Sequence, residues 1–304
     1  MVELIGNVKV DYCFYSGKDD YSDGDIENEI LEIVKNNTEE ELEIVIAKDN
    51  RWPVLYHLSL VRQNILEWYP FEKNAEILEI GAGCGAITGV LSRKASEVTC
   101  NELSKRRSLI NAYRNQDCEN IKILVGNFND VCFEKQYDYI TLIGVFEYAR
   151  YYTVGDSPYT DFLKRIKKLL KPQGKILMAI ENKFGLKYWA GVREDHTGVF
   201  FDGIEGYHAT DSKVRTFSKI ELEDIIVKAG FSHCEFFYPH PDYKFPRIIF
   251  SEDCLPKEED LTCSLDQYDN SRMYLFNETA VYKNILASKV YPFFANSFLI
   301  EIGV

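Results

Sequence analysis

Apolar strands and helices alternate along the chain from residue 77 to residue 181, and this alternation restricts the fold more than any other feature. Runs such as ILEIG, EVTCNEL, NIKILVG and YDYITLIG are largely apolar, and helix-like segments separate most of them. Strands with continuous apolar runs are typical of parallel sheets that are covered on both faces. The repeated strand–helix–strand order therefore predicts an α/β fold with a doubly wound, mostly parallel sheet.

Two segments lie outside this alternation. Residues 1–52 combine a short strand, VKVDYCFY, with a helix from about Ile26 to Val34 whose apolar residues keep helical spacing. A second helix is expected over residues 53–68, where Pro53 suits the first turn. We predict an N-terminal α+β extension over 1–52, a core domain over 53–251, and a C-terminal extension over 252–304. The last extension ends in an apolar run, NSFLIEIGV, so we expect the chain to be part of a longer one.

Composition excludes several classes of function. The 304 residues carry a formal charge of −13, from 35 basic and 48 acidic side chains, and this charge disfavours nucleic acid as a partner. No run of 18 apolar residues and no signal peptide is found, so we expect a cytoplasmic protein without a membrane span. The sequence does not predict an oligomeric state.

The eight cysteines do not form any C-x-x-C pair, and several of them lie within apolar strand-like runs. This pattern indicates reduced, buried thiols and argues against a structural zinc site. No bound metal is therefore expected.

The segment AEILEIGAGCGAITGVL places Gly81, Gly83 and Gly85 at the end of the first core strand. Glycine permits positive φ and close approach of a ligand to the backbone. The spacing alone fits a dinucleotide as well as a nucleoside without phosphate. Glu79, two residues before the first glycine, would repel a pyrophosphate and attract an ammonium group. Glu102 ends the next strand, where a carboxylate can accept hydrogen bonds from ribose hydroxyls of either ligand.

Several motifs together resemble the class I S-adenosylmethionine-dependent methyltransferases: EIGAGCG, the strand-ending Glu102, GNFND, YDYITLIGVFEY and LLKPQGKILMAIEN. The resemblance implies a Rossmann-like, seven-stranded sheet with an antiparallel last strand, and S-adenosylmethionine as cofactor. Many members of this family carry Asp where Asn127 stands, which makes Asp130 a reserve candidate for binding adenine. The cofactor contacts that the resemblance implies are Glu79, Gly81, Ala82, Gly83, Gly85, Glu102, Leu103, Asn127, Phe128, Gly144, Val145 and Phe146.

Three further segments resemble methyltransferase regions of bacterial proteins that assemble cell-surface polysaccharides. They are YHLSLVRQNIL, ENKFGLKYWAGVREDHTGVFFDGIEGY and YPHPDYKFPRIIFS. This second resemblance implies a sugar-like acceptor. Residues 182–216, which follow the fifth core strand, are expected to form a lid-like insertion, because loops of this length in compact domains are often functional.

The sequence also offers candidates for the chemistry of methyl transfer. An oxygen nucleophile needs a base, and histidine is the natural one near neutral pH. We predict His196 as base or acceptor-binding residue, beside Asp195, with Glu147 and Tyr148 next to the transferred methyl group. The predicted acceptor-binding residues are His57, Arg62, Glu181, Asn182 and Trp189.

The expected function is methyl transfer to a small-molecule or saccharide acceptor, with oxygen as the favoured target. The fourth core strand is not followed by an N-P-P-Y-like segment or a Pro-Cys pair, which argues against methylation of bases. Two alternatives stay open: an NAD(P)-binding oxidoreductase, and a non-catalytic S-adenosylmethionine-binding module of a larger polysaccharide-assembly protein.

Overall fold

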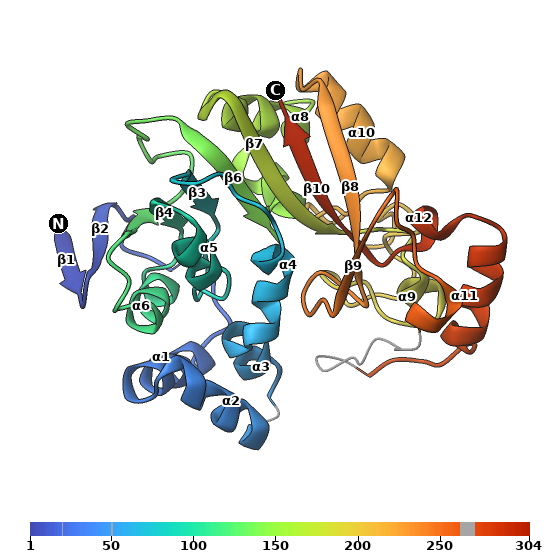
Figure 1. Ribbon diagram of the computed structural model, residues 1–304, viewed down its shortest axis with the longest axis horizontal. Helices are drawn as coiled ribbons and strands as arrows, with labels where there is room; N and C mark the ends of the chain where they lie inside the picture. The colour runs from blue at the N-terminus through green and yellow to red at the C-terminus, as the bar shows by residue number, and fades with distance from the viewer. Residues whose placement is uncertain (20, 50, 262–270) are drawn as a thin grey trace. The chain divides into compact units, whose positions relative to one another are not determined.

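The computed structural model describes residues 1–19, 21–49, 51–261 and 271–304. The chain forms two compact units, and Figure 1 labels their elements. The first unit is Met1–Leu142 with Lys168–Lys175, and the second is Ile143–Lys167 with Ile176–Val304. Cys263 lies outside the described residues.

Six strands form the sheet of the first unit, in the order β1-β2-β5-β4-β3-β6. β1 pairs antiparallel with β2, and each later neighbouring pair is parallel. The predicted N-terminal strand thus joins the sheet by pairing with β5. The strands are β1 (Val2–Ile5), β2 (Val8–Phe14), β3 (Glu76–Ile80), β4 (Glu97–Glu102), β5 (Ile121–Gly126) and β6 (Tyr137–Ile143).

The helix expected over residues 53–68 is interrupted at Ser59. This residue has an extended ψ of 129°, and its side chain accepts a hydrogen bond from the Val61 backbone N–H. Helix α2, which precedes this segment, starts at a capping box of Thr38 and Glu41 that was not predicted from the sequence. The helices of this unit are α1 (Ile26–Asn36), α2 (Glu39–Lys48), α3 (Trp52–Leu58), η1 (Leu60–Gln63), α4 (Asn64–Glu67), α5 (Thr88–Lys94) and α6 (Lys105–Arg114).

The second unit has the strand order β7-β10-β8-β9. β8 (His233–His240) and β9 (Ile248–Ser251) pair antiparallel and form a hairpin. β10 (Ser297–Gly303), from the C-terminal extension, pairs antiparallel with β8 on its other edge. β7 (Leu170–Glu181) includes the KPQG segment and has residues in both units. The α/β class is confirmed, with ten strands among the described residues instead of the seven expected.

Short helices complete the second unit. α10 begins with a capping box, in which Ser218 and Glu221 exchange side chain to backbone hydrogen bonds. The helices are η2 (Phe146–Tyr148), α7 (Ala149–Tyr152), α8 (Pro158–Lys167), α9 (Leu186–Trp189), α10 (Lys219–Lys228), η3 (Glu258–Asp260), α11 (Glu278–Ala287) and α12 (Tyr291–Phe294). Within the described ranges, every helix is too short or too polar to cross a bilayer.

The N-terminal helices are attached to the first unit by apolar packing and by a buried ion pair. Ile30, Leu42 and Leu58 belong to one buried cluster with Ile110 of α6. The Glu27 carboxylate is fully buried, with Oε1 2.7 Å from Arg107 Nε and Oε2 3.1 Å from Arg106 Nε. This carboxylate therefore connects α1 to the start of α6.

Replacing Glu27 by Gln is expected to lower the free energy of unfolding by about 3 kcal/mol, because the buried Arg107 guanidinium loses its fully buried partner and keeps only the more exposed Asp23. The measurement is urea unfolding followed by circular dichroism. Glu32→Gln is the matched control: Glu32 pairs with Lys35 on the same helix, but its side chain is 65% exposed, so a change of less than about 0.5 kcal/mol is expected. Equal effects of the two substitutions would contradict this account of the α1 attachment.

Candidate active site

The turn after β3 requires glycine at three positions. Gly81, Gly83 and Gly85 have φ values of 69°, 54° and 76°, in the left-handed region that other residues rarely adopt. A Cβ atom on Gly85 would lie 2.5 Å from the Asn111 side-chain oxygen of α6, so this glycine permits helix packing. A Cβ atom on Gly83 would meet no atom within 4 Å. The backbone at Gly83 therefore faces open space, where a ligand can approach it.

Glu102, at the end of β4, holds this turn through its carboxylate. Its Oε2 accepts a hydrogen bond of 2.7 Å from the Gly83 N–H, and its Oε1 accepts one of 2.8 Å from the Ser104 N–H. Burial raises the pKa of Glu102, while the bonds from these backbone N–H groups favour the charged form. The carboxylate is thus fixed beside the open side of the turn, in the place predicted for binding ribose hydroxyls.

Glu79 is the second carboxylate of this region and is 4% exposed. Its Oε2 accepts a hydrogen bond of 2.6 Å from the Thr88 hydroxyl at the start of α5. Burial raises the pKa of Glu79 to about 7, so its charge is adjustable near neutral pH. Two acidic groups and an open glycine backbone fit a nucleoside that carries an ammonium group. The residues present therefore fit S-adenosylmethionine better than a ligand with a pyrophosphate.

The remaining predicted cofactor residues of the first unit are arranged around local turns. The Asn127 side-chain oxygen accepts a hydrogen bond of 2.9 Å from the Asn129 N–H. Phe128 is 7% exposed, and its ring lies 5.5 Å from that of Phe133. Asp130, the reserve candidate, is exposed. Ala82 is buried and Leu103 is half-buried.

Gly144, Val145 and Phe146 follow β6 and belong to the second unit. Gly144 has a φ of 69°, and a Cβ atom there would lie 2.8 Å from the Tyr243 hydroxyl oxygen. Phe146 is fully buried, with its ring 5.5 Å from that of Tyr159. Phe146 is thus a core residue of this unit, whereas Val145 is half-buried.

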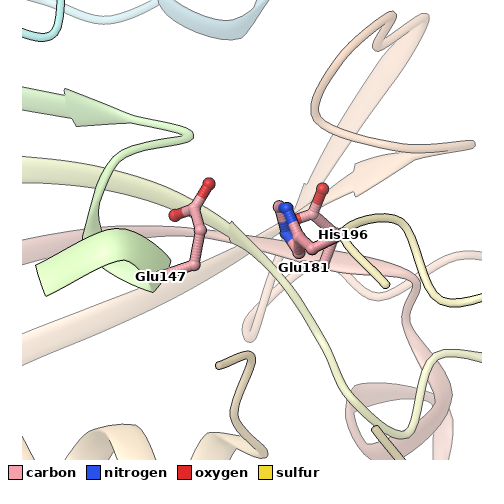
Figure 2. Close-up of side chains that lie close together, drawn as sticks. All are labelled: Glu147, Glu181 and His196. Carbon is pink, nitrogen blue, oxygen red and sulfur yellow. The ribbon is translucent and has the colours of Figure 1, made fainter. Parts of the chain in front are cut away.

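Glu147, Glu181 and His196 come together inside the second unit. One potential ligand atom from each of the three side chains lies within 4.8 Å of those of the other two. Figure 2 shows the Glu181 carboxylate beside the His196 ring, with Glu147 reaching toward them from η2. Glu181 ends β7, and His196 stands in the predicted insertion. The sequence analysis had named all three residues without predicting that they form one cluster.

The cluster, defined as these three side chains, contains polar atoms without hydrogen-bond partners. Glu147 Oε2, Glu181 Oε2 and His196 Nε2 are all buried and have no hydrogen-bond partner. His196 Nε2 and Glu181 Oε2 form an ion pair over 3.6 Å, which is longer than a hydrogen bond. His196 Nδ1 lies 3.1 Å from the Tyr148 hydroxyl oxygen, so Tyr148 orients the ring. Unpaired buried polar atoms are uncommon and indicate a functional site.

The environment moves the pKa values of these groups in different directions. Burial, with the charge of Glu181, raises the pKa of Glu147 to about 8. Burial opposes ionisation of Glu181 as well, but Lys244 and His196 outweigh it and hold the pKa of Glu181 well below its usual range. Burial alone would lower the pKa of His196, yet the neighbouring carboxylates, Glu181 first, raise it to about 9. Perturbed groups of this kind gather at functional sites.

An ion-pair network adjoins the cluster, and the sequence analysis missed most of its members. Lys244 Nζ pairs with Glu181 Oε1 and lies 3.1 Å from Asp195 Oδ1. Lys187 is 1% exposed, with its Nζ 2.8 Å from Asp195 Oδ2 and 2.7 Å from Asp242 Oδ2. Asp195 is therefore held by two lysines. Charged residues within the otherwise apolar segments FGLKYW and PHPDYKFP were the available signal.

Glu194 fixes the turn that carries His196, and it too was missed. Its Oε2 accepts hydrogen bonds of 2.7 Å from the backbone N–H groups of His196 and Thr197. Its Oε1 accepts a hydrogen bond of 3.1 Å from the Tyr207 hydroxyl. The imidazole of His196 is thus positioned from its backbone by Glu194 and from its Nδ1 by Tyr148.

Four predicted acceptor-binding residues have other surroundings. In the first unit, His57 Nε2 is 2.7 Å from Asp23 Oδ2, and the Arg62 guanidinium lies 3.9 Å from the centre of the Tyr56 ring. In the second unit, the Asn182 side-chain nitrogen donates to two backbone carbonyl oxygens, which indicates a structural role. Trp189 is 38% exposed, and its Nε1 donates to the Phe184 carbonyl oxygen.

Comparison with known proteins identifies the central part of the chain. Residues 78–176 match the family model described as a methyltransferase domain. An uncharacterized methyltransferase of Staphylococcus carnosus is 27% identical over 157 residues, which cover 51% of this chain and 69% of the relative. A malonyl-[acyl-carrier protein] O-methyltransferase of Priestia megaterium is 26% identical over 110 residues, which cover 36% of this chain and 38% of the relative.

Solved structures show a looser likeness. A methyltransferase of Thermotoga maritima, described as a possible histamine N-methyltransferase, is 15% identical, with a TM-score of 0.47 over 87% of this chain and 97% of that one. Phosphoethanolamine N-methyltransferase 1 of Haemonchus contortus is also 15% identical, with a TM-score of 0.49 over 92% of this chain and 48% of that one. These structural similarities do not indicate which acceptor the protein uses.

The resemblance to polysaccharide-assembly proteins stays a prediction, because none of these relatives is named for such a role. The family match covers the end of β3, the glycine turn and Glu102, which are the residues from which the resemblance was first drawn. The predicted class, together with S-adenosylmethionine as its cofactor, is therefore confirmed, and the match extends over residues 78–176, which fit the model of a methyltransferase domain.

Proposed function

We propose that this protein transfers the methyl group of S-adenosylmethionine to a hydroxyl oxygen of a small-molecule or saccharide acceptor. The observation that carries the donor half is the pair of buried carboxylates, Glu79 and Glu102, at a glycine turn whose Gly83 side is open. Glu102 can accept hydrogen bonds from the ribose hydroxyls, and Glu79 can attract the ammonium group of the methionine moiety. Glu79 would repel the pyrophosphate of NAD, whereas Glu102 suits the ribose of either ligand.

The acceptor half rests on the Glu147, Glu181 and His196 cluster of the second unit. In the reaction the carbon–sulfur bond of the donor breaks as the oxygen–carbon bond forms, and the acceptor hydroxyl loses its proton. Polar groups that bind the hydroxyl and take up its proton are required for such a nucleophile, whereas an amine can react without them. The cluster offers unpaired acceptor atoms in a buried place. The O-methyltransferase among the relatives agrees with an oxygen target.

The saccharide part of the proposal is supported by the insertion. Trp189 of α9 is 38% exposed, although its surroundings are largely buried. An exposed indole can stack on the apolar face of a sugar ring.

The test of the whole proposal is transfer of a radiolabelled methyl group from S-adenosylmethionine to a panel of sugar nucleotides and glycans. Binding of the cofactor without transfer to any hydroxyl acceptor would favour a non-catalytic module.

Calorimetric titration is expected to show binding of S-adenosylhomocysteine and no binding of NAD. Glu102→Ala is expected to weaken S-adenosylhomocysteine binding by about a hundredfold, because two charge-assisted hydrogen bonds to the ribose are lost. The matched control is Glu97→Ala at the other end of β4, whose side chain is 43% exposed and whose loss is expected to leave the affinity unchanged. Unaltered affinity of the Glu102 variant would contradict the assignment, as would heat from NAD alone.

Affinity for S-adenosylhomocysteine is expected to rise with pH through about 7. The pKa of Glu79 is raised to about 7 by burial, so its carboxylate is mostly neutral below this pH and charged above it. Only the charged form attracts the ammonium group, which gives the sign of the effect. The measurement is calorimetric titration between pH 6 and pH 8. In Glu79→Gln this rise should vanish; if the variant keeps the full pH dependence, Glu79 is not the responsible group.

Glu147→Gln is expected to leave S-adenosylhomocysteine affinity unchanged and to reduce kcat for methyl transfer by about a hundredfold, since proton removal contributes rate factors of this size. Turnover is measured with the acceptor identified from the panel. Glu205→Gln serves as the control, because Glu205 is an exposed carboxylate of the same insertion. If the Glu147 and Glu205 variants turn over equally fast, the cluster has no part in acceptor chemistry.

A further inference from the structure

We propose that Glu147, Glu181 and His196 form a binding site for one divalent metal cation of the manganese or zinc type. The proposal deepens the proposed function, on which it rests for the role of the site: a bound cation would hold the acceptor hydroxyl. The site itself is inferred from the geometry of the second unit alone.

Three unpaired atoms in one buried place carry this inference. Glu147 is 1% exposed and Glu181 is 0% exposed, and each has one carboxylate oxygen without a hydrogen-bond partner. The third atom is His196 Nε2. Burying a polar group without a hydrogen-bond partner destabilises the folded chain. A water molecule has only two hydrogens to donate, whereas one cation can accept electron pairs from all three atoms.

The His196 ring is held in the form that a metal requires. Its Nδ1 is 3.1 Å from the Tyr148 hydroxyl oxygen, which can accept the Nδ1–H. A cation that displaces the Nε2 proton of His196 then finds the lone pair of Nε2 aimed at the cluster, and the second ring nitrogen of metal-binding histidines is typically bonded in this way. The backbone of His196 is fixed in addition by Glu194. The His196 side chain therefore needs little reorganisation to bind a cation.

Formal charge also favours a divalent ion. The cluster and its network contain four carboxylates, Glu147, Glu181, Asp195 and Asp242, against the ammonium groups of Lys187 and Lys244. With all four carboxylates ionised and His196 neutral, as it must be when it binds a metal, these groups leave a charge of −2, which one divalent cation balances. Lys187 pairs with Asp195 and Asp242, and Lys244 pairs with Asp195 and with the other oxygen of Glu181, so the ion pairs of the two lysines leave Glu147 Oε2, Glu181 Oε2 and His196 Nε2 to the cation.

The donor set indicates which cations fit. Carboxylates suit magnesium and manganese, and imidazole suits zinc and iron, so a mixed set of two carboxylates and one imidazole favours ions that accept both. Three protein ligands leave positions open for water or an acceptor oxygen. A hydroxyl bound to such an ion becomes more acidic, which is the property that an oxygen acceptor needs.

A second group of potential ligands provides the contrast. His233, Glu235 and Glu301 also lie within 4.8 Å of one another, but His233 is exposed and Glu235 is half-buried. Within the described residues, none of their atoms is buried without a partner. We therefore place the cation at the cluster in the second unit and use Glu235 as the control position.

The test is titration of MnCl₂ into chelator-treated full-length protein, followed by electron paramagnetic resonance of free Mn²⁺ and by calorimetry. One Mn²⁺ per chain is expected to bind, and both Glu147→Gln and Glu181→Gln are expected to weaken it at least about tenfold. Glu235→Gln should bind Mn²⁺ like the unchanged protein. Thermal melting of each variant shows that the fold is retained, and ZnCl₂ and MgCl₂ are titrated in parallel.

The outcomes separate this inference from the proposed function. Absence of binding by all three cations, or binding that the Glu147 and Glu181 variants leave intact, would overturn the metal site. Methyl transfer that continues at full rate in excess chelator would overturn its role in the reaction while leaving the proposed function standing. Tight Mn²⁺ binding that depends on Glu147, in a protein without methyl transfer, would support the site and contradict the proposed function.

Discussion

The hydrogen bond between the Gly83 N–H and the Glu102 carboxylate is the interaction on which the first unit depends for its ligand site. It connects the turn after β3 to the end of β4 over 2.7 Å. The turn can approach the carboxylate because its glycines adopt positive φ. The other oxygen of the same carboxylate accepts the Ser104 N–H, just before α6 begins. One side chain thus fixes two strand ends and a helix start around an open backbone surface.

The second unit buries more carboxylates than lysines. Lys187 and Lys244 compensate Asp195, Asp242 and one oxygen of Glu181. Among the residues that the structure describes, no lysine pairs with Glu147, and the pKa of its carboxyl is raised to about 8 by burial and by the charge of Glu181. Burying charges costs more than burying apolar groups of similar size. Such an arrangement is therefore better explained by a chemical role than by stability.

The sequence predicted those parts of the fold that depend on local pattern. The strands from β3 to β7 were visible as apolar runs, and the capping box of α10 was visible as Ser218 and Glu221. The insertion of β10 beside β8 depends on pairing between distant residues, such as Ile300 with Phe236, which no local pattern reveals. The break at Ser59 was missed because helical apolar spacing continues across it.

The candidate site also has one part that could be predicted from local sequence pattern and another part that could not. Glu79, the glycines and Glu102 stand at fixed distances from strand ends, so their neighbourhood followed from the chain order. Glu147, Glu181 and His196 were each named, because two of them follow strands and the third is a histidine in a long insertion. Their convergence, and the lysines beside them, depends on the path of the insertion. That path is set by contacts such as Glu194 with the backbone of His196.

The most direct measurement of the central claim is a crystal structure with S-adenosylhomocysteine bound. The account predicts that both ribose hydroxyls lie within hydrogen-bond distance of the Glu102 carboxylate, with the nucleoside against the open backbone of Gly83. A nucleoside bound elsewhere, or a Glu102 carboxylate that makes no contact with it, would contradict the account.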